Sequence, residues 1–336
     1  MVAASATSLL PVLLFLGALL LLDSYKLIPL RAIVLAIAAG ALAAVVAYGA
    51  NRWLQAALAL DLASYSRYVA PVVEELLKAS YVVWLFRRSR VGFVADAATY
   101  GFATGTGFAL VENVLLLQGH PSATIWAWVV RGFGTALMHG GTTAIVAMMT
   151  RTLQRRDTGF HLALVLPGLA VAMVLHALYN QFLLAPLLAT ALIMLVLPGI
   201  MLALFRKSER ETGAWLGTGF DMDQELLRVT RAGALADTPV GRYLRDLRTS
   251  YPPEVIVDTM CLLRLRAELG VRAKGMLLLR EAGFEPAPDP SLQPRLDEMR
   301  YLERSIGRAG MRALRPFLHT SSQDLWQLHL LSGSRR

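Results

Sequence analysis

Residues Leu30–Gly49 read LRAIVLAIAAGALAAVVAYG, an apolar run whose only charged side chain is Arg31. An α-helix needs about 20 such residues to cross the hydrocarbon core of a membrane, because each residue adds about 1.5 Å. The run therefore predicts a membrane-spanning helix. Applied to the rest of the chain, the same criterion predicts about seven spans: Thr7–Leu22, Leu30–Gly49, Tyr68–Phe86, Phe93–Leu117, Thr124–Met149, Leu162–Leu184 and Ala185–Phe205.

The composition agrees with a membrane protein, since 55% of the residues are hydrophobic and only 17% are charged. Soluble domains carry about 25% charged residues. After Phe205 charges become frequent and no apolar run is long enough to span a membrane. We therefore expect an all-α protein, with a polytopic transmembrane bundle in residues 1–205 and a helical cytoplasmic domain in residues 206–336. Amphipathic spacing predicts helices in this second region over Asp223–Ala234, Pro253–Glu281 and Ser291–Leu318.

Basic residues predict the orientation of the spans, because Lys and Arg concentrate in cytoplasmic loops. They follow the first, third, fifth and seventh spans, as Lys26, Arg31, Arg87, Arg88, Arg90, Arg151, Arg155, Arg156, Arg206 and Lys207. This pattern predicts an extracytoplasmic N-terminus and a cytoplasmic C-terminus. Arg52 and Arg67, between the second and third spans, are exceptions. In residues 206–336 basic and acidic residues alternate, so we expect no nucleic acid as a partner. The net charge of +9 would be attracted to anionic lipid headgroups, so we expect the lipid bilayer as a partner.

Four of the predicted spans contain polar residues that hydrocarbon disfavours. Each such group costs a few kcal/mol to insert and normally faces a protein-lined interior. The motifs are Glu74-Glu75-Leu76-Leu77-Lys78, Phe108-Ala109-Leu110-Val111-Glu112-Asn113, His139-Gly140-Gly141-Thr142-Thr143 and His176-Ala177-Leu178-Tyr179-Asn180. Three lie in the extracytoplasmic half of their spans and one lies near the middle. Together they predict one shared polar site open toward the outside.

The residue types favour hydrolysis at this site. A glutamate can take a proton from water, a histidine can orient that water, and an asparagine amide can stabilise an oxyanion. Histidine and glutamate also bind zinc, for which Glu75, Glu112, His139 and His176 are the candidate ligands. The alternative is a proton- or ion-coupled transporter that uses the same buried Glu, Lys and His side chains. Residues four apart share a helix face, so we also expect Glu74 with Lys78, His139 with Thr143, and His176 with Asn180 to point the same way.

In chain order, Glu-Glu-x-x-Lys, Gly-x-Gly-Phe-Ala-x-x-Glu-Asn, a single His, and His-x-x-x-Asn resemble the PrsW family of intramembrane proteases. Here these elements lie between Pro71 and Gln181, and the second begins at Gly105. The resemblance implies a multi-spanning protease of the bacterial cytoplasmic membrane. It also implies a single-pass membrane substrate such as an anti-sigma factor, cut on the extracytoplasmic side.

PrsW proteins are distantly similar to the CAAX prenyl endopeptidase superfamily, and that similarity implies individual roles. Glu74 would be the base, Glu75 the partner of Lys78, and His176 with Asn180 the stabilising pair. The superfamily has Phe-x-x-x-His where this chain has Phe108-Ala-Leu-Val-Glu112, so His139 is expected to take that place. The expected catalytic residues are Glu74, Glu75, Glu112, His139, His176 and Asn180, supported by Lys78, Asn113 and Thr143.

Overall fold

The computed structural model describes residues 2–23, 28–120, 122–154, 160–232, 238–249, 251–284, 287, 289–314 and 331. The ordered elements within these ranges are all helices, with no strand among them. The chain divides into two compact units, Met1–Glu209 and Arg210–Arg336, called here the membrane unit and the C-terminal unit. The predicted all-α helical bundle is confirmed.

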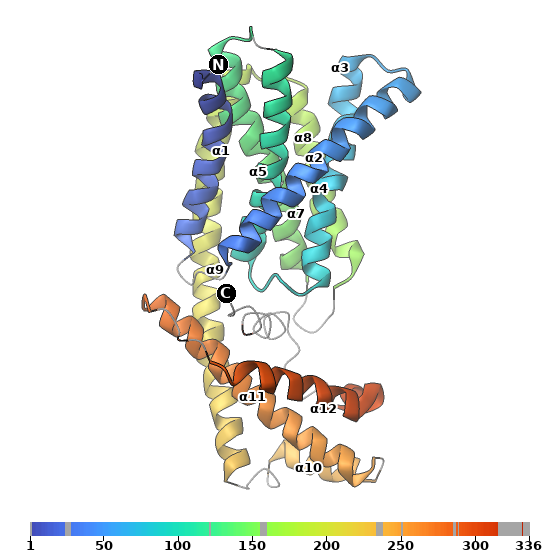
Figure 1. Cartoon of the computed structure of the whole chain (residues 1–336), viewed down its shortest axis with the longest axis vertical. Coiled ribbons are helices and arrows are strands. Elements are labelled where there is room, and N and C mark those ends of the chain that lie inside the picture. The colour runs from blue at the N-terminus through green and yellow to red at the C-terminus, as the bar shows by residue number, and fades with distance from the viewer. Residues whose placement is uncertain are drawn as a thin grey trace. The chain divides into compact units, whose positions relative to one another are not determined.

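Every predicted span forms a helix in the membrane unit (Figure 1). Five helical segments are long and apolar enough to cross a membrane, namely α1, α2, α5, α8 with the turn before it, and α9. The spans predicted at Tyr68–Phe86 and Thr124–Met149 form helices that contain more polar residues. The elements are α1 (Val2–Leu22), α2 (Leu30–Leu58), α3 (Leu62–Ser64), η1 (Tyr65–Val69), α4 (Ala70–Arg87), α5 (Val94–Gly119), α6 (Ile125–Val129), η2 (Val130–Thr135), α7 (Ala136–Leu153), η3 (Leu162–Val165), α8 (Leu166–Asn180) and α9 (Pro186–Arg231).

Two of these elements, η1 and η2, are π-helical turns. They lie directly before α4 and α7, two of the helices that carry the polar motifs. Such turns are uncommon and frequently occur at functional sites.

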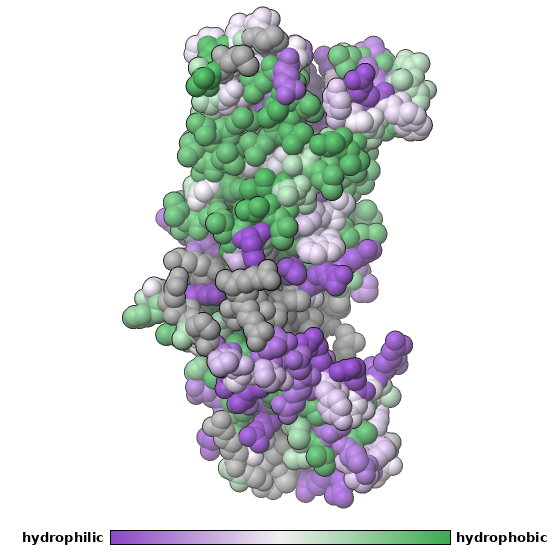
Figure 2. Space-filling view, in the orientation of Figure 1, coloured by the Kyte–Doolittle hydropathy of each residue, from purple (hydrophilic) through white to green (hydrophobic). Residues whose placement is uncertain are grey.

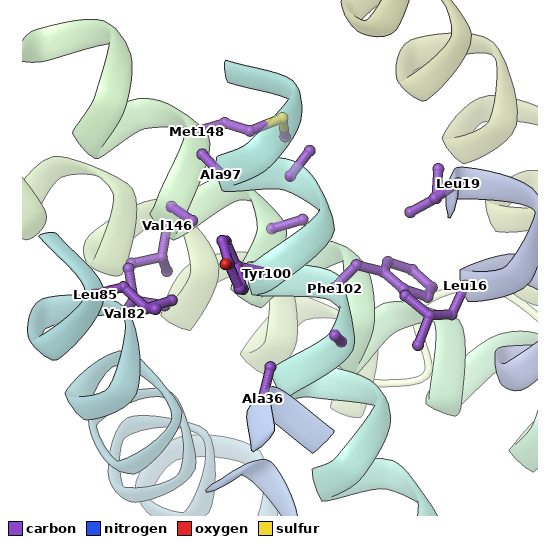
Figure 3. Packing of buried hydrophobic residues seen from close by; sticks show 14 of the residues in the cluster. Leu16, Leu19, Ala36, Val82, Leu85, Ala97, Tyr100, Phe102, Val146 and Met148 are labelled. Atoms are coloured by element: carbon purple, nitrogen blue, oxygen red, sulfur yellow. The ribbon is translucent and has the colours of Figure 1, made fainter. Parts of the chain in front are cut away.

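Helix α5 forms the centre of the membrane unit and packs closely against α2 and α7. A Cβ atom on Gly105 would lie 2.2 Å from the backbone oxygen of His139 in α7, and one on Gly107 would lie 1.9 Å from that of Ile37 in α2. Only glycine permits these approaches, because small residues let helix backbones meet. Nearer the start of α5, Phe102 packs toward Leu16 and Leu19 of α1 (Figure 3).

The surface of the membrane unit is largely apolar (Figure 2). Leu42 on α2 is 65% exposed and Leu195 on α9 is 75% exposed. Extended apolar surface of this kind is rare on soluble monomers, but it is what the lipid-facing side of a transmembrane bundle requires.

The C-terminal unit consists of the end of α9, α10 (Pro239–Leu247), α11 (Pro253–Glu281) and α12 (Leu292–Ala313). Its core includes Leu262 and Leu269 of α11 and Leu296 and Leu302 of α12. The helix predicted at Asp223–Ala234 is the last part of α9, which ends at Arg231. Residues 315–318 of the third predicted helix, and the loop residues Lys26, Arg155 and Arg156, lie outside the described residues.

Candidate active site

The polar motifs come together inside the membrane unit, where α4, α5, α7 and α8 meet. The imidazole rings of His139 on α7 and His176 on α8 lie edge to face, with 4.9 Å between their centres. Both histidines are buried, with Glu75 and Lys78 of α4 beside them. Residues separated by about 100 positions in the sequence are thus direct neighbours.

Glu75 is the most heavily bonded residue of the cluster. It is fully buried, and its Oε1 lies 2.6 Å from Lys78 Nζ, 2.8 Å from His176 Nδ1 and 3.2 Å from Thr142 Oγ1. A carboxylate only accepts hydrogen bonds, so Nδ1 of His176 carries a proton, and in the neutral ring Nε2 is then the nitrogen with the lone pair. The other carboxylate oxygen, Oε2, is buried without a hydrogen-bond partner in the described part of the chain.

Lys78 connects this carboxylate to the second imidazole. Its Nζ lies 3.2 Å from Nδ1 of His139. An ammonium group only donates, so Nδ1 accepts and the ring proton of His139 is on Nε2, which donates to Glu112 Oε2 at 2.8 Å. Glu112 Oε1 in turn pairs with Arg131 Nη2 at 3.0 Å. An alternating chain of acidic, basic and imidazole groups therefore crosses from α4 to η2.

Glu74 is the carboxylate of the cluster with the fewest cationic neighbours. Its side chain is 13% exposed, whereas that of Glu75 is completely buried. Glu74 Oε1 accepts from Asn51 Nδ2 at 3.1 Å, and Asn51 Oδ1 accepts from the hydroxyl of Tyr65 at 2.9 Å. Glu74 Oε2 lies 3.8 Å from the lone-pair nitrogen Nε2 of His176. Asn51 thus fixes one oxygen of Glu74, and the other oxygen points toward His176.

The sequence of this chain matches a known family over residues 28–205, described as PrsW family intramembrane metalloprotease. The match covers just over half of the chain. The chain belongs to the PrsW family. As a PrsW protein it is a multi-pass membrane protein and a peptidase, which favours hydrolysis over the transport alternative. No curated protein and no solved structure matches it.

The PrsW description includes a metal, and one group of side chains in this chain fits one. Glu74, His139 and His176 each offer a ligand atom, and these atoms lie within 4.8 Å of one another. One carboxylate and two imidazoles suit zinc with an open position for water. His176 also has the outer support that metal-bound histidines usually show, because its Nδ1 bonds to Glu75. His139 would first have to give up its bond to Lys78 or to Glu112.

This donor group differs from the ligand set expected from the sequence, which was Glu75, Glu112, His139 and His176. Glu75 bonds to Nδ1 of His176 and Glu112 bonds to Nε2 of His139. The carboxylate that can share a metal ion with the two imidazoles is that of Glu74. The physical reason is that adjacent residues on an α-helix point about 100° apart, so Glu74 and Glu75 cannot face the same point.

Lys78 bonds to Glu75, three residues before it, rather than to Glu74, with which it was expected to share a helix face. The pairing of Glu75 with Lys78 implied by the resemblance is confirmed. Asn180, expected to share a face with His176, donates to the backbone oxygen of Ser66 in the turn before α4 at 2.9 Å, while His176 bonds to Glu75 of α4.

Thr143 and Asn113, two of the expected supporting residues, do not bond to the imidazoles or to the glutamates in the described part of the chain. Thr143 donates to the backbone oxygen of His139 at 2.9 Å, and this bond lies within α7. Asn113 lies behind the cluster, where it donates to Ser8 O at 2.8 Å and accepts from Arg131 Nε at 3.1 Å. Asn113 therefore orients Arg131, which orients Glu112.

Four residues of the network were not predicted from the sequence: Asn51, Tyr65, Thr142 and Arg131. Arg131 could have been found, because an arginine inside an apolar span needs a buried acidic partner. The other three are uncharged and stand near helix ends or beside a stronger motif, so no sequence signal distinguishes them.

Proposed function

We propose that this PrsW protein hydrolyses a peptide bond of a single-pass membrane protein, and that Glu74 activates the attacking water. The observation that carries the proposal is the 3.8 Å separation between Glu74 Oε2 and His176 Nε2. With Glu74 ionised and His176 neutral, both atoms are acceptors. One water molecule can donate to both at about 2.8 Å, which leaves its own lone pair directed away from them toward a carbonyl carbon.

The two adjacent glutamates then have different tasks. Glu75 is neutralised by Lys78 and fixed by Thr142, so it holds His176 in one orientation. Glu74 has no lysine or arginine bonded to it in the described residues and is partly accessible. It is therefore the carboxylate that can take the proton of the water and later pass it to the leaving amine.

A bound zinc ion would be held by Glu74, His139 and His176 and would supply a water of lowered pKa and a polarised carbonyl. In that case Glu74 would serve as a ligand, while Glu75 and Glu112 would still hold the two imidazoles. Glu74 and His176 would therefore belong to the water-activating group in either case, directly without the ion and as its ligands with it.

The position of the cluster along the helices supports cleavage near one membrane surface. Glu74 lies near the start of α4, and Glu112 and His176 lie near the ends of α5 and α8. With the orientation predicted from the basic loops, these ends face outward. The proposal is thus an extracytoplasmic cut in the bacterial cytoplasmic membrane, with a membrane-anchored regulator such as an anti-sigma factor as the substrate.

The test is cleavage of candidate single-pass proteins in proteoliposomes by the wild type and by Glu74→Gln, Glu75→Gln and His176→Ala. General acid–base catalysis contributes about 10²- to 10⁴-fold, so each change should reduce the rate by at least about 10²-fold. Exposed Leu42→Ala on α2 serves as the matched control and should cut normally. Undiminished cleavage by all three site variants would exclude the mechanism.

A further inference from the structure

A groove of about 540 Å³ lies within the membrane unit between α7, α8 and α9. Its walls are almost entirely apolar and include Ile145 of α7, Leu175 and Leu178 of α8, and Leu192 of α9. The volume lies within the range of about 300–1,000 Å³ that is usual for ligand sites. The mechanism described above does not use this groove.

The groove is long in the direction of the helices. On α9 its lining extends from Pro186 to Ile200. At about 1.5 Å per residue this is roughly 21 Å, about two thirds of the hydrocarbon thickness of a membrane. Its shape therefore suits an extended or helical segment that lies beside α9, rather than a compact ligand.

The groove also reaches the catalytic cluster. Thr142 lines the groove and donates to Glu75 Oε1 at 3.2 Å, so a single side chain belongs to both. Two further lining residues, Met138 and Leu175, directly precede His139 and His176 in the chain. A segment in the groove would lie against Thr142, which bonds to the carboxylate that holds His176.

Small residues on the walls would let another helix approach. A Cβ atom on Gly141 would meet only Leu197 side-chain atoms, at 3.4 and 3.6 Å, which is ordinary contact. Gly105, by contrast, is required by the protein's own packing, since its Cβ would lie 2.2 Å from a backbone atom. Gly141 thus leaves a recess that its own neighbours do not need, and Ala189 faces the same groove from α9.

Helix α9 is held loosely on this side. Only 11% of the residues in its most apolar stretch are buried inside the protein. Pro198 interrupts its backbone hydrogen bonds near the inner end of the groove. A neighbour that packs along α9 would therefore cover apolar surface without displacing many existing contacts.

We propose that this groove docks the apolar transmembrane segment of the substrate and thereby delivers the adjoining peptide bond to Glu74 and His176. The inference rests on the proposed function. Membrane lipid would cover any apolar face equally, whereas this groove is continuous with the catalytic cluster through Thr142. Its length and its small wall residues fit a helix of another protein.

Photo-crosslinking tests the docking. The probe is a tagged single-pass protein with a leucine- and alanine-rich span that the wild type cleaves in proteoliposomes. In the inactive Glu74→Gln chain, p-benzoylphenylalanine is placed at Ile145 or Leu192 in the groove, or at exposed Leu42 on α2 as the control. Crosslinks from both groove positions and few from Leu42 are expected. Equal crosslinking at Leu42, or adducts with lipid alone, would overturn the proposal.

A groove-filling substitution adds an independent readout. Gly141→Leu should raise KM for the anchored probe by about ten-fold and change kcat less, because extra methylenes in an apolar site cost binding first. Leu42→Ala, on the exposed face of α2 and outside the groove, should keep the wild-type KM. An unchanged KM in Gly141→Leu refutes the docking and leaves the proposed peptidase standing. If the wild type cleaves no single-pass probe at all, the proposed function fails and the docking fails with it.

Discussion

Two buried lysines, one in each unit, form the same bond with different consequences. Lys78 lies 2.6 Å from Glu75 in the membrane unit, and Lys274 lies 2.6 Å from Asp223 in the C-terminal unit. The other neighbours of Lys274 are the backbone oxygen of Gly219 and the ring of Trp215. Lys78 instead contacts the imidazole of His139, whose other nitrogen bonds to Glu112.

The difference lies in what the partners can do next. A carbonyl oxygen and an aromatic ring stabilise an ammonium group but exchange no protons at neutral pH. An imidazole exchanges protons readily, and Glu75 shares its oxygen between Lys78 and His176. The pair in the C-terminal unit therefore stabilises the fold, whereas the pair in the membrane unit also sets the protonation and orientation of two histidines.

The largest contrast is expected from removing each lysine. Lys78→Met should reduce proteolysis by at least about 10²-fold, because His176 and His139 lose their common support. It should also destabilise the membrane unit by about 3–5 kcal/mol, because Glu75 is left buried without its cation. Lys274→Met should leave proteolysis within about two-fold of wild type. It should lower the stability of the C-terminal unit by about 0.5–3 kcal/mol, the usual range for a single substitution. Cleavage rates and thermal unfolding in micelles measure both, and equal activity of the two variants would break the comparison.

Removal of both partners sharpens the comparison. Glu75→Gln combined with Lys78→Met leaves no uncompensated buried charge, so it should recover part of the stability lost in Lys78→Met, roughly 1–3 kcal/mol. Proteolysis should stay lost, because Nδ1 of His176 no longer has a carboxylate partner. The matched pair, Asp223→Asn with Lys274→Met, should keep its activity. Recovery of cleavage in the first double variant would show that the membrane pair is purely structural.

Zinc addition should distinguish a substitution in the membrane unit from one in the C-terminal unit by a smaller effect, a shift in Tm. A ligand present at 100 times its Kd stabilises the folded state by about 2.7 kcal/mol. Zinc should raise the Tm of the membrane unit in the wild type, and the rise should be absent in His176→Ala. The Lys274→Met protein should respond like the wild type. A rise of equal size in His176→Ala would place the ion elsewhere.

The smallest effect on cleavage is expected from changes to Asn51 and Tyr65, which orient Glu74. Asn51→Ala removes the hydrogen bond to Glu74, worth about 0.5–1.5 kcal/mol, together with the bond from Tyr65, so kcat should fall by about three- to ten-fold. Tyr65→Phe, one bond farther away, should have a smaller effect. A comparison of kcat with KM checks this, because a positioning role lowers kcat while KM stays close to the wild-type value.

Much of the fold could be predicted because apolar runs of membrane length leave few alternatives, and charged residues within them stand out. The sequence could not decide which glutamate pairs with Lys78, since spacings of three and four both allow contact on a helix. Nor could it place Asn51 and Thr142, whose uncharged side chains do not stand out from their neighbours as the glutamates and histidines do. The change in composition after Phe205 marks a change in surroundings, but α9 continues to Arg231 because a helix can pass from lipid into water without ending.

The π-helical turn η2 makes chain length itself part of the site. A π turn closes from residue i to i+5 and so contains one residue more than the α turn it replaces. Arg131 lies in this turn and His139 lies in the α-helix that follows. Deleting Gly134 from this turn would leave an ordinary α turn, so the helix on either side of it would keep its register. Deleting one residue from the regular α-helix after the turn, before His139, would instead rotate Arg131 by about 100° relative to His139. The effect of a one-residue deletion here therefore depends on which turn loses the residue.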